Sequence, residues 1–594
     1  MVADRPAFGP NFPVIGAFTT EVHPSGLIVA RSPDREAPDL FGAFATAEDV
    51  LGQATSIREM AAALGQYDFE DVLGKLAMLN AFMTDKNIKD RNLNRELIEG
   101  LLPQNVATAL RPLIDSGERA FTSPHVVLTL AKLALLHANG QERIPLEHVG
   151  LLLLGTADHV GGHVRADDEA WPLELTRYGW FQYRDPHSAL WGRFQRLWRE
   201  VIPSLSDDPR YVDPGDVIEE AMGIDYATFL GLGIAVSARF DQMLRQGSLW
   251  LPTNIEGTTA SPEDIATYID SISAERAWFI DPGESDEDAA FSWNFTRMRL
   301  RPLLRHNDRL MPFSLGMLRE KVTDGLFYTV ADLMAERGPA ESQRWREFFG
   351  LVWETYVRRL IDEGVGDRAR MVPEARMAAA WPHEQICDNV IEYPNRYLLI
   401  EAVARRFTEA TVARGELPDL EEDLRKAAVI KARQLCSTIR LLMNRSEALA
   451  TELGRTLPSS DITRYTPVVV LPGPFPLMPV LTDRVAQVLK DDEQCAELRL
   501  PRIDDVAILT AGDFEYLVGT AAHTGRTLVD LLDAWRESEL NESNWRMWAS
   551  ESIPGGAYLP NWLMEGGREG IMWGARRLFR EDELRPARGE EEST

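Results

Sequence analysis

The stretch ICDNVIEYPNRYLLIEAVARRFTEAT, residues 386–411, decides how this chain is interpreted. Two apolar runs, 386–392 and 396–402, are joined by a Pro-Asn turn, and this pattern predicts the two strands of a hairpin. The first run carries Asp388 and the second carries Glu401. Burying a carboxylate in an apolar strand costs free energy unless the group is paired or holds a metal ion. Two such groups in one hairpin therefore mark a candidate site.

The hairpin can bring the two carboxylates together on one face of a sheet. Side chains alternate between the faces of a strand, and cross-strand neighbours on one face lie close together. Two carboxylates at that distance repel each other unless a divalent cation neutralises them. Hard oxygen ligands of this kind suit Mg²⁺ or Mn²⁺. We therefore expect Asp388 and Glu401 to be metal ligands.

A third carboxylate, Glu354, lies on a helix that we expect over residues 344–364. It borders the apolar stripe of that helix, so it can face the sheet instead of solvent. The stripe consists of Phe349, Val352, Trp353, Tyr356, Val357 and Leu360.

Around the hairpin, strand-like and helical segments alternate, which predicts an α/β layer with a buried sheet. The expected strands cover 374–380, 386–392, 396–403, 468–471 and 506–511, and the expected helices cover 344–364, 419–443 and a segment that begins near Asp513.

The order of these residues resembles the PD-(D/E)XK nuclease superfamily, the fold of restriction endonucleases. Its members share a helix with a Glu, a strand with an Asp, a strand with Glu-X-Lys, and a following helix. The segments G350-x-x-x-E354-x-Y356-V and L398-L-I-E401-A-V403, with Asp388 between them, match that order. The resemblance implies a restriction-endonuclease-like domain in which Asp388 and Glu401 hold the metal ion and Glu354 assists.

One position departs from the family pattern. Two residues after Glu401 the family has a lysine that activates water and stabilises phosphate charge, and this chain has Val403. Valine can do neither. Arg405 on the same strand face, or Lys426 or Lys431 on the following helix, are candidate substitutes, and we favour Lys431.

A purely structural interpretation of the same residues stays open. Asp388 can be an acid of a turn at the strand end, and Glu401 can pair with Arg405 or Arg396. Glu354 can form a surface ion pair with Arg358 one helical turn away, an arrangement that contributes little stability.

The length and charge of the chain indicate its number of domains and its partners. A chain of 594 residues predicts several domains, and its net charge of −29 disfavours binding of nucleic acid over the whole surface. Residues 341–440, however, contain 16 Lys and Arg against 17 Asp and Glu, so this part is nearly neutral. Three dispersed cysteines and the lack of a long apolar run suit a cytoplasmic protein.

These observations predict a multidomain α plus α/β chain. Its expected parts are an irregular N-terminal arm (1–45), an irregular all-α region of one or two domains (46–335), the PD-(D/E)XK-like α/β domain (336–550), and a C-terminal extension with a disordered acidic tail (551–594).

The expected function is hydrolysis of DNA or RNA phosphodiester bonds with Mg²⁺ or Mn²⁺ through Glu354, Asp388, Glu401 and Lys431, and the family resemblance implies a role in a defence system. The helical region is then expected to recognise the substrate, a protein partner or a trigger, and no membrane is expected. The alternative is a pseudo-nuclease that has lost its lysine and acts as a scaffold or regulator.

Overall fold

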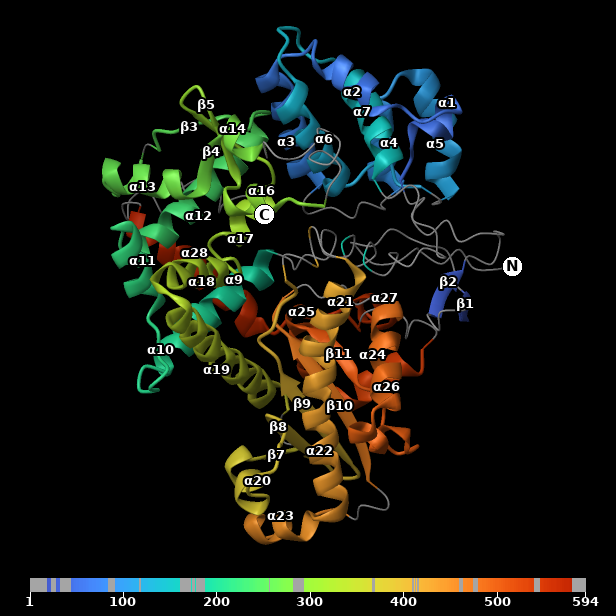
Figure 1. Ribbon diagram of the computed structural model, residues 1–594, viewed down its shortest axis with the longest axis vertical. Coiled ribbons are helices and arrows are strands. Elements are labelled where there is room, and N and C mark those ends of the chain that lie inside the picture. The colour runs from blue at the N-terminus through green and yellow to red at the C-terminus, as the bar shows by residue number, and fades with distance from the viewer. Residues whose placement is uncertain are drawn as a thin grey trace, which may run out of the picture.

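A mixed five-stranded sheet forms the centre of the α/β part of the computed structural model (Figure 1). The strand order is β11-β10-β9-β8-β7; β7, β8 and β9 pair antiparallel, whereas β9, β10 and β11 pair parallel. The strands are β7 (Arg370–Val372), β8 (Asn389–Tyr393), β9 (Arg396–Ala402), β10 (Arg464–Leu471) and β11 (Ala507–Thr510). The hairpin predicted around Pro394-Asn395 is therefore confirmed as β8 and β9.

The structure describes residues 19–22, 28–31, 44–83, 91–116, 119–160, 173, 177, 187–255, 257–280, 293–365, 369–408, 411, 413, 416–458, 463–473, 479–538 and 545–578. The acidic tail that was expected to be disordered lies outside these residues. Of the N-terminal arm, the described parts include an antiparallel pair of strands, β1 (Thr19–Val22) and β2 (Ile28–Arg31).

Helices cover both faces of this sheet, and as a result every residue of its central strand, β9, is buried. Helix α22 (Ile430–Asn444) packs against β9 and β10, while α19 (Pro339–Gly364) and α25 (Ala511–Thr524) pack against each other and against strands of the sheet. The predicted apolar stripe of α19 is confirmed, since all six of its side chains are buried. The other helices of this part are α20 (Glu374–Ala380), α21 (Leu417–Leu424), η4 (Arg425–Val429), α23 (Ser446–Leu453), α24 (Pro479–Asp491), η5 (Glu493–Arg499), α26 (Leu528–Arg536) and α27 (Trp545–Ser552).

One predicted strand is wrong. Residues 374–380 form helix α20, because the sequence EARMAAA consists of strong helix formers and begins directly after Pro373. The strand that pairs with β8 is β7, which ends just before that proline.

The region before α19 is mostly helical, as expected from its periodicity. The helices are α1 (Ala47–Leu51), α2 (Ile57–Leu64), α3 (Phe69–Met83), α4 (Arg91–Leu101), α5 (Gln104–Ser116), α6 (Pro124–His137), α7 (Leu146–His159), α9 (His187–Arg196), η1 (Leu197–Val201), α10 (Ile202–Ser204), α11 (Pro214–Met222), α12 (Tyr226–Arg245), α13 (Pro262–Ile272), α14 (Arg276–Phe279), α16 (Thr296–Leu300), α17 (Leu315–Glu320) and α18 (Leu326–Arg337). Two of these helices, α1 and α13, start with a capping box, in which Thr46 or Ser261 pairs with an aspartate three residues on.

The expectation that 46–335 is all-α is wrong in one place, where four short strands form a second sheet of order β3-β6-β5-β4. These are β3 (Leu251–Pro252), β4 (Ser273–Glu275), β5 (Leu303–His306) and β6 (Arg309–Pro312). A two-residue turn joins β5 to β6, and both of its residues, Asn307 and Asp308, have positive φ. Asn and Asp tolerate this conformation, so the local turn chemistry overrides the helical surroundings.

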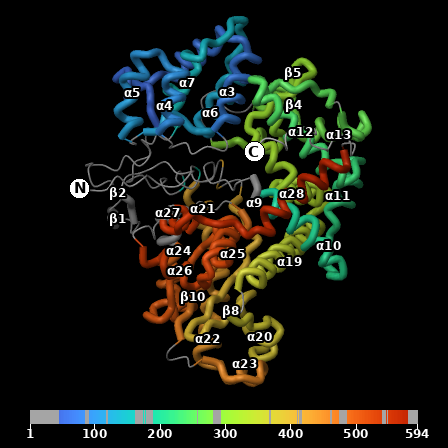
Figure 2. The backbone as a smooth tube through the Cα atoms, turned by 180° about the vertical axis from the view of Figure 1, so that it is seen from behind, coloured from blue at the N-terminus to red at the C-terminus, as the bar shows by residue number. Residues whose placement is uncertain are grey.

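The last described helix, α28 (Asn561–Leu578), returns to the helical region and packs against α9 and α12 (Figure 2). Glycine permits this close approach: a Cβ atom on Gly192 of α9 would lie 2.1 Å from the carbonyl oxygen of Leu563. The α/β part is thus bracketed along the chain by two segments of the helical region.

Among the described residues no single helix is long and apolar enough to cross a membrane; α11 and α12 together meet the length and composition test, but with a bend of 83° between them.

Candidate active site

Asp388 and Glu401 lie side by side at the end of the hairpin that is opposite to its turn. Asn389 of β8 is paired with Ile400 of β9, and one further step of this register sets Asp388 against Glu401. The backbone N–H of Ala402 donates to Asp388 Oδ2 at 2.7 Å, which holds the Asp388 carboxylate against β9. The sequence-predicted pair is therefore brought together, on one face of the sheet.

Lys431 reaches this pair from the first turn of α22. Its Nζ atom lies 2.9 Å from Glu401 Oε1, and the Glu401 side chain is 0% exposed whereas that of Lys431 is 34% exposed. The second oxygen, Glu401 Oε2, is buried and has no hydrogen-bond partner. A buried carboxylate oxygen without a donor is costly, so this atom marks the position where a cation or a proton is most favourable.

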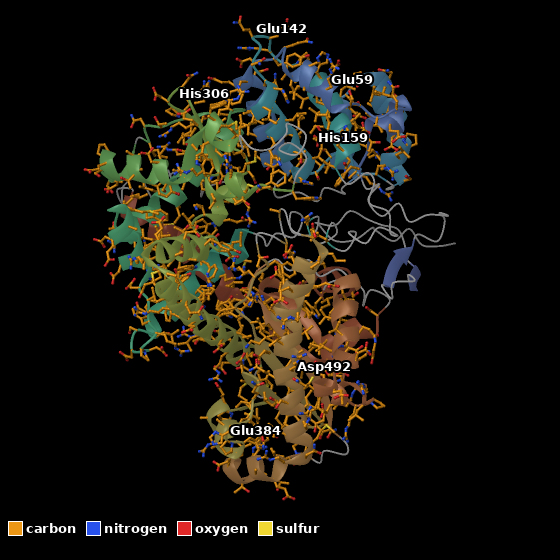
Figure 3. The ribbon with its side chains drawn as sticks, in the orientation of Figure 1. Glu59, Glu142, His159, His306, Glu384 and Asp492 are labelled. Atoms are coloured by element: carbon orange, nitrogen blue, oxygen red, sulfur yellow. The ribbon has the colours of Figure 1, made fainter. Side chains whose placement is uncertain are left out.

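Two ion pairs fix the helix that carries Lys431. Arg433 Nε donates to Asp492 Oδ2 at 2.7 Å, and Arg445 Nη1 donates to Glu384 Oε1 at 2.6 Å just after the helix ends. Figure 3 labels both acceptors, Asp492 and Glu384, along the length of α22. The lysine is therefore presented by a helix that is attached at both ends.

Glu354 faces the same group from α19. Its side chain is partly buried, and among the described residues it forms no ion pair with Arg358. Arg358 instead pairs with Glu374 at 3.1 Å, and the same Nη2 atom lies 3.3 Å from the Asp388 backbone oxygen. The surface pair that the structural interpretation proposed for Glu354 is thus not the one that forms.

The three carboxyl groups have raised pKa values, with burial as the first cause of each shift. Burial and the charge of Asp388 raise the pKa of Glu354 to about 7 and that of Glu401 to about 8. Burial raises the pKa of Asp388 to about 6, and the Ala402 N–H opposes this shift. Burial lowers the pKa of Lys431, but the charges of Glu401, Asp388 and Glu354 outweigh it, so the pKa is raised and the amine stays protonated. The site therefore holds more carboxyl groups than its single lysine can neutralise.

Val403 takes no part in this arrangement. Its N–H donates to the Val470 oxygen of β10, and its side chain is 2% exposed, so it belongs to the core. Of the other candidate cations, Lys426 pairs with Glu422 at 2.6 Å and Arg405 is exposed. Arg396 binds Asp504 and Asp533 at the other end of β9. Lys431 is the candidate that contacts Glu401.

Two of the carboxylates in this site suit a magnesium ion. Within the described ranges, no group of three or more His, Cys, Asp and Glu side chains is arranged as a metal site. Mg²⁺, however, commonly uses one or two protein carboxylates and completes its shell with water and substrate phosphate. Asp388 and Glu401, with the unpartnered Oε2 atom, supply such a pair.

A second buried charge cluster joins the helical region to the α/β part. Arg193 of α9 donates from Nε and Nη2 to the two oxygens of Glu515 of α25 at 2.7 and 2.8 Å, and from Nη1 to Asp324 at 2.9 Å. Tyr356, two residues beyond Glu354 on α19, donates to Glu515 at 2.5 Å. Sequence reasoning missed this cluster, because its residues lie up to 322 positions apart and carry no motif.

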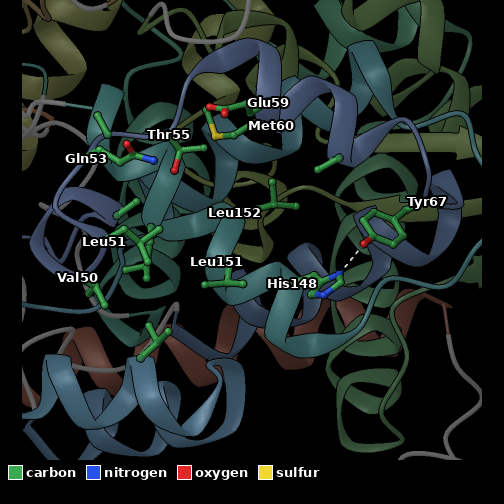
Figure 4. A pocket seen from close by; sticks show the side chains of 15 residues that line it. Val50, Leu51, Gln53, Thr55, Glu59, Met60, Tyr67, His148, Leu151 and Leu152 are labelled. Atoms are coloured by element: carbon green, nitrogen blue, oxygen red, sulfur yellow. Dashed lines mark hydrogen bonds between the residues drawn. The ribbon is translucent and has the colours of Figure 1, made fainter.

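A separate pocket of about 370 Å³ lies in the helical region, between α1, α2 and α7 (Figure 4). Its lining is mainly aliphatic, with a hydrogen bond of 2.5 Å between the Tyr67 hydroxyl and His148 Nδ1 at one end. The backbone N–H of Thr55, which also lines the pocket, donates to the buried Asp158 at 2.8 Å. The pocket contains none of the candidate catalytic residues.

Comparisons of the chain with protein-family models, with curated proteins and with solved structures found no match.

Proposed function

We propose that this protein is a metal-dependent nuclease that hydrolyses phosphodiester bonds of DNA or RNA through its α/β part. The observation that carries the proposal is the pairing of Asp388 and Glu401 across one hairpin, with Lys431 at 2.9 Å and Glu401 Oε2 buried without a donor. The element order α19, β7, α20, β8, β9, α21, η4, α22, α23, β10 contains the helix, strand, strand and helix that carry the four residues, and this supports a restriction-endonuclease-like domain. A role in defence is analogy from that fold alone.

Each of the four residues has a chemical role in this proposal. Asp388 and Glu401, assisted by Glu354, would hold Mg²⁺ or Mn²⁺, which lowers the pKa of bound water and neutralises phosphate charge. Lys431 replaces the lysine that position 403 lacks: its protonated amine can orient a water molecule and stabilise charge that develops on the phosphate. Glu354, with a pKa of about 7, can accept a proton at neutral pH.

The energetics favour a functional reason for these carboxyl groups. A single buried ion pair is often no more stable than apolar side chains of the same volume. Here one lysine faces three carboxyl groups, and one carboxylate oxygen has no donor at all. Such an arrangement is unfavourable for folding and favourable for binding a divalent cation.

The test is calorimetric titration of Mg²⁺ and Mn²⁺ into the wild type, Asp388→Ala, Glu401→Ala and the control Glu392→Ala. Glu392 lies on the same hairpin but pairs with Arg455. The proposal expects binding that Asp388→Ala and Glu401→Ala abolish and Glu392→Ala retains, followed by metal-dependent cleavage of DNA or RNA. If the wild type binds neither ion, even with oligonucleotide present, the proposal is wrong.

A catalytically inactive scaffold is the second candidate. Val403 in the core and Lys431 bound to Glu401 Oε1 favour it, because an internal ion pair can replace the metal ion. Its partner would then be a protein bound through the helical region. This candidate predicts that neither ion binds and that Glu401→Ala leaves partner binding unchanged.

A further inference from the structure

The loop between α10 and α11 brings an arginine of the helical region alongside α19, the helix that carries Glu354. Tyr211 of this loop is fixed to α19 by Arg344, whose Nη2 atom donates to the Tyr211 oxygen at 2.7 Å, and by an edge-to-face contact with Phe348 at 5.4 Å. At the other end, Arg359 donates to the Ser204 hydroxyl at 2.8 Å. The loop therefore runs along α19 past the turn that carries Glu354.

Arg210 lies between these two attachment points. Its guanidinium donates from Nε and Nη2 to the two oxygens of Asp208, both at 2.9 Å, and its backbone N–H also donates to Asp208 at 2.9 Å. This double hydrogen bond fixes the guanidinium plane, yet the side chain remains 47% exposed. Three of its five N–H donors are not used by Asp208.

The charge of Arg210 acts on two carboxylates of α19. It interacts electrostatically with Glu354 and Glu347, which lie seven residues, or two helical turns, apart on that helix. No ion pair within 4.0 Å joins Arg210 to either glutamate among the described residues. An exposed, oriented guanidinium beside a carboxylate site suits a phosphate oxygen, which arginine binds through several donors at once.

We propose that Arg210 binds a backbone phosphate of the nucleic-acid substrate next to the scissile bond, so that the helical region and the α/β part form one substrate-binding surface. The inference rests on the proposed function. It assigns the loop a role in substrate binding and none in bond cleavage.

The test measures the affinity of the full-length protein for a labelled oligonucleotide, in the form that the wild type cleaves, with Ca²⁺ in place of Mg²⁺ and over a series of salt concentrations. Arg210→Gln should weaken binding by about five- to tenfold and reduce the slope of log K against log salt by about one, as expected for a lost phosphate contact. Arg210→Lys should keep the slope. The control Arg337→Gln removes an arginine that pairs with Glu220 elsewhere in the helical region and should change neither quantity.

The outcomes separate the two proposals. If the wild type binds and cleaves but Arg210→Gln keeps its affinity and salt slope, the inference is wrong and the nuclease proposal stands. An equal loss in Arg337→Gln also overturns the inference, because the effect is then one of overall charge. If the wild type neither binds nor cleaves any oligonucleotide, the proposed function is wrong, and the inference that rests on it is wrong as well.

Discussion

Replacing Glu401 with glutamine should stabilise the protein at neutral and alkaline pH. Burial and the Asp388 charge raise the Glu401 pKa from 4.5 to about 8, so between these values the folded state keeps a proton that the unfolded state has lost. The stability contributed by this proton is complete below pH 4.5 and is lost as the pH rises through 8. At pH 7, about 2.5 pH units above the unfolded-state pKa, the protein has lost about 3 kcal/mol of this stability, at 1.36 kcal/mol per unit.

Glutamine has the shape of glutamate without this dependence on pH. The raised pKa already includes the opposing effect of Lys431, and glutamine leaves a polar amide buried in the site, so we expect a net stabilisation of about 1–3 kcal/mol at pH 8. At pH 5 the wild-type Glu401 is protonated and closely resembles glutamine. The difference between the two proteins should then fall below about 1 kcal/mol.

The assay is denaturant unfolding followed by tryptophan fluorescence at pH 5 and pH 8, in buffer that contains a chelator. Glu392→Gln is the matched control on the same hairpin. Arg455 donates from both Nη atoms to the two Glu392 oxygens at 2.7 Å, so this variant should lose stability at pH 8. A loss of more than about 1 kcal/mol in Glu401→Gln at pH 8 would refute the reasoning, because Glu401 would then be the partner in a structural ion pair.

Three further predictions concern the site and its support. Lys431→Ala should reduce single-turnover cleavage by at least about 100-fold while calorimetry still detects Mg²⁺ binding, and equal loss of both would assign the lysine to folding of the site. The affinity for Mg²⁺ should rise between pH 6 and pH 8.5, because Glu354 and Glu401, with pKa values of about 7 and 8, must lose protons to bind it; an affinity that calorimetry finds flat over this range would contradict this. Arg193→Met should destabilise the protein by about 3–5 kcal/mol in scanning calorimetry, since Glu515 would stay buried without its cation, and an unchanged unfolding temperature would show that the buried Arg193–Glu515 pair does not stabilise the fold.

The parts of the structure that local sequence patterns determine could be predicted. The apolar stripe of α19 and the Pro-Asn turn specify a helix and a hairpin, and the register of β8 and β9, continued by one residue, sets Asp388 against Glu401. Lys431 was favoured for its place on the following helix, and there its amine contacts Glu401.

Features that depend on contacts distant in sequence could not be predicted. The contact of Arg210 with its surroundings depends on how a loop of the helical region docks on α19, and no local pattern encodes this. The cluster of Arg193 and Glu515 likewise brings together two ordinary surface-type residues from opposite halves of the chain. The strand predicted over 374–380 is wrong for a different reason, because this alanine-rich segment has a high helix propensity.

The return of α28 to α9 and α12 has a consequence for biosynthesis. A ribosome releases the helical region long before it makes α28, so the surfaces of α9 and α12 that α28 covers stay exposed until the α/β part has been translated. A product truncated after residue 550 would contain all four candidate catalytic residues but would leave those surfaces uncovered. We therefore expect such fragments to aggregate or be degraded, so that a chain with the complete candidate site accumulates only when its last helix is in place.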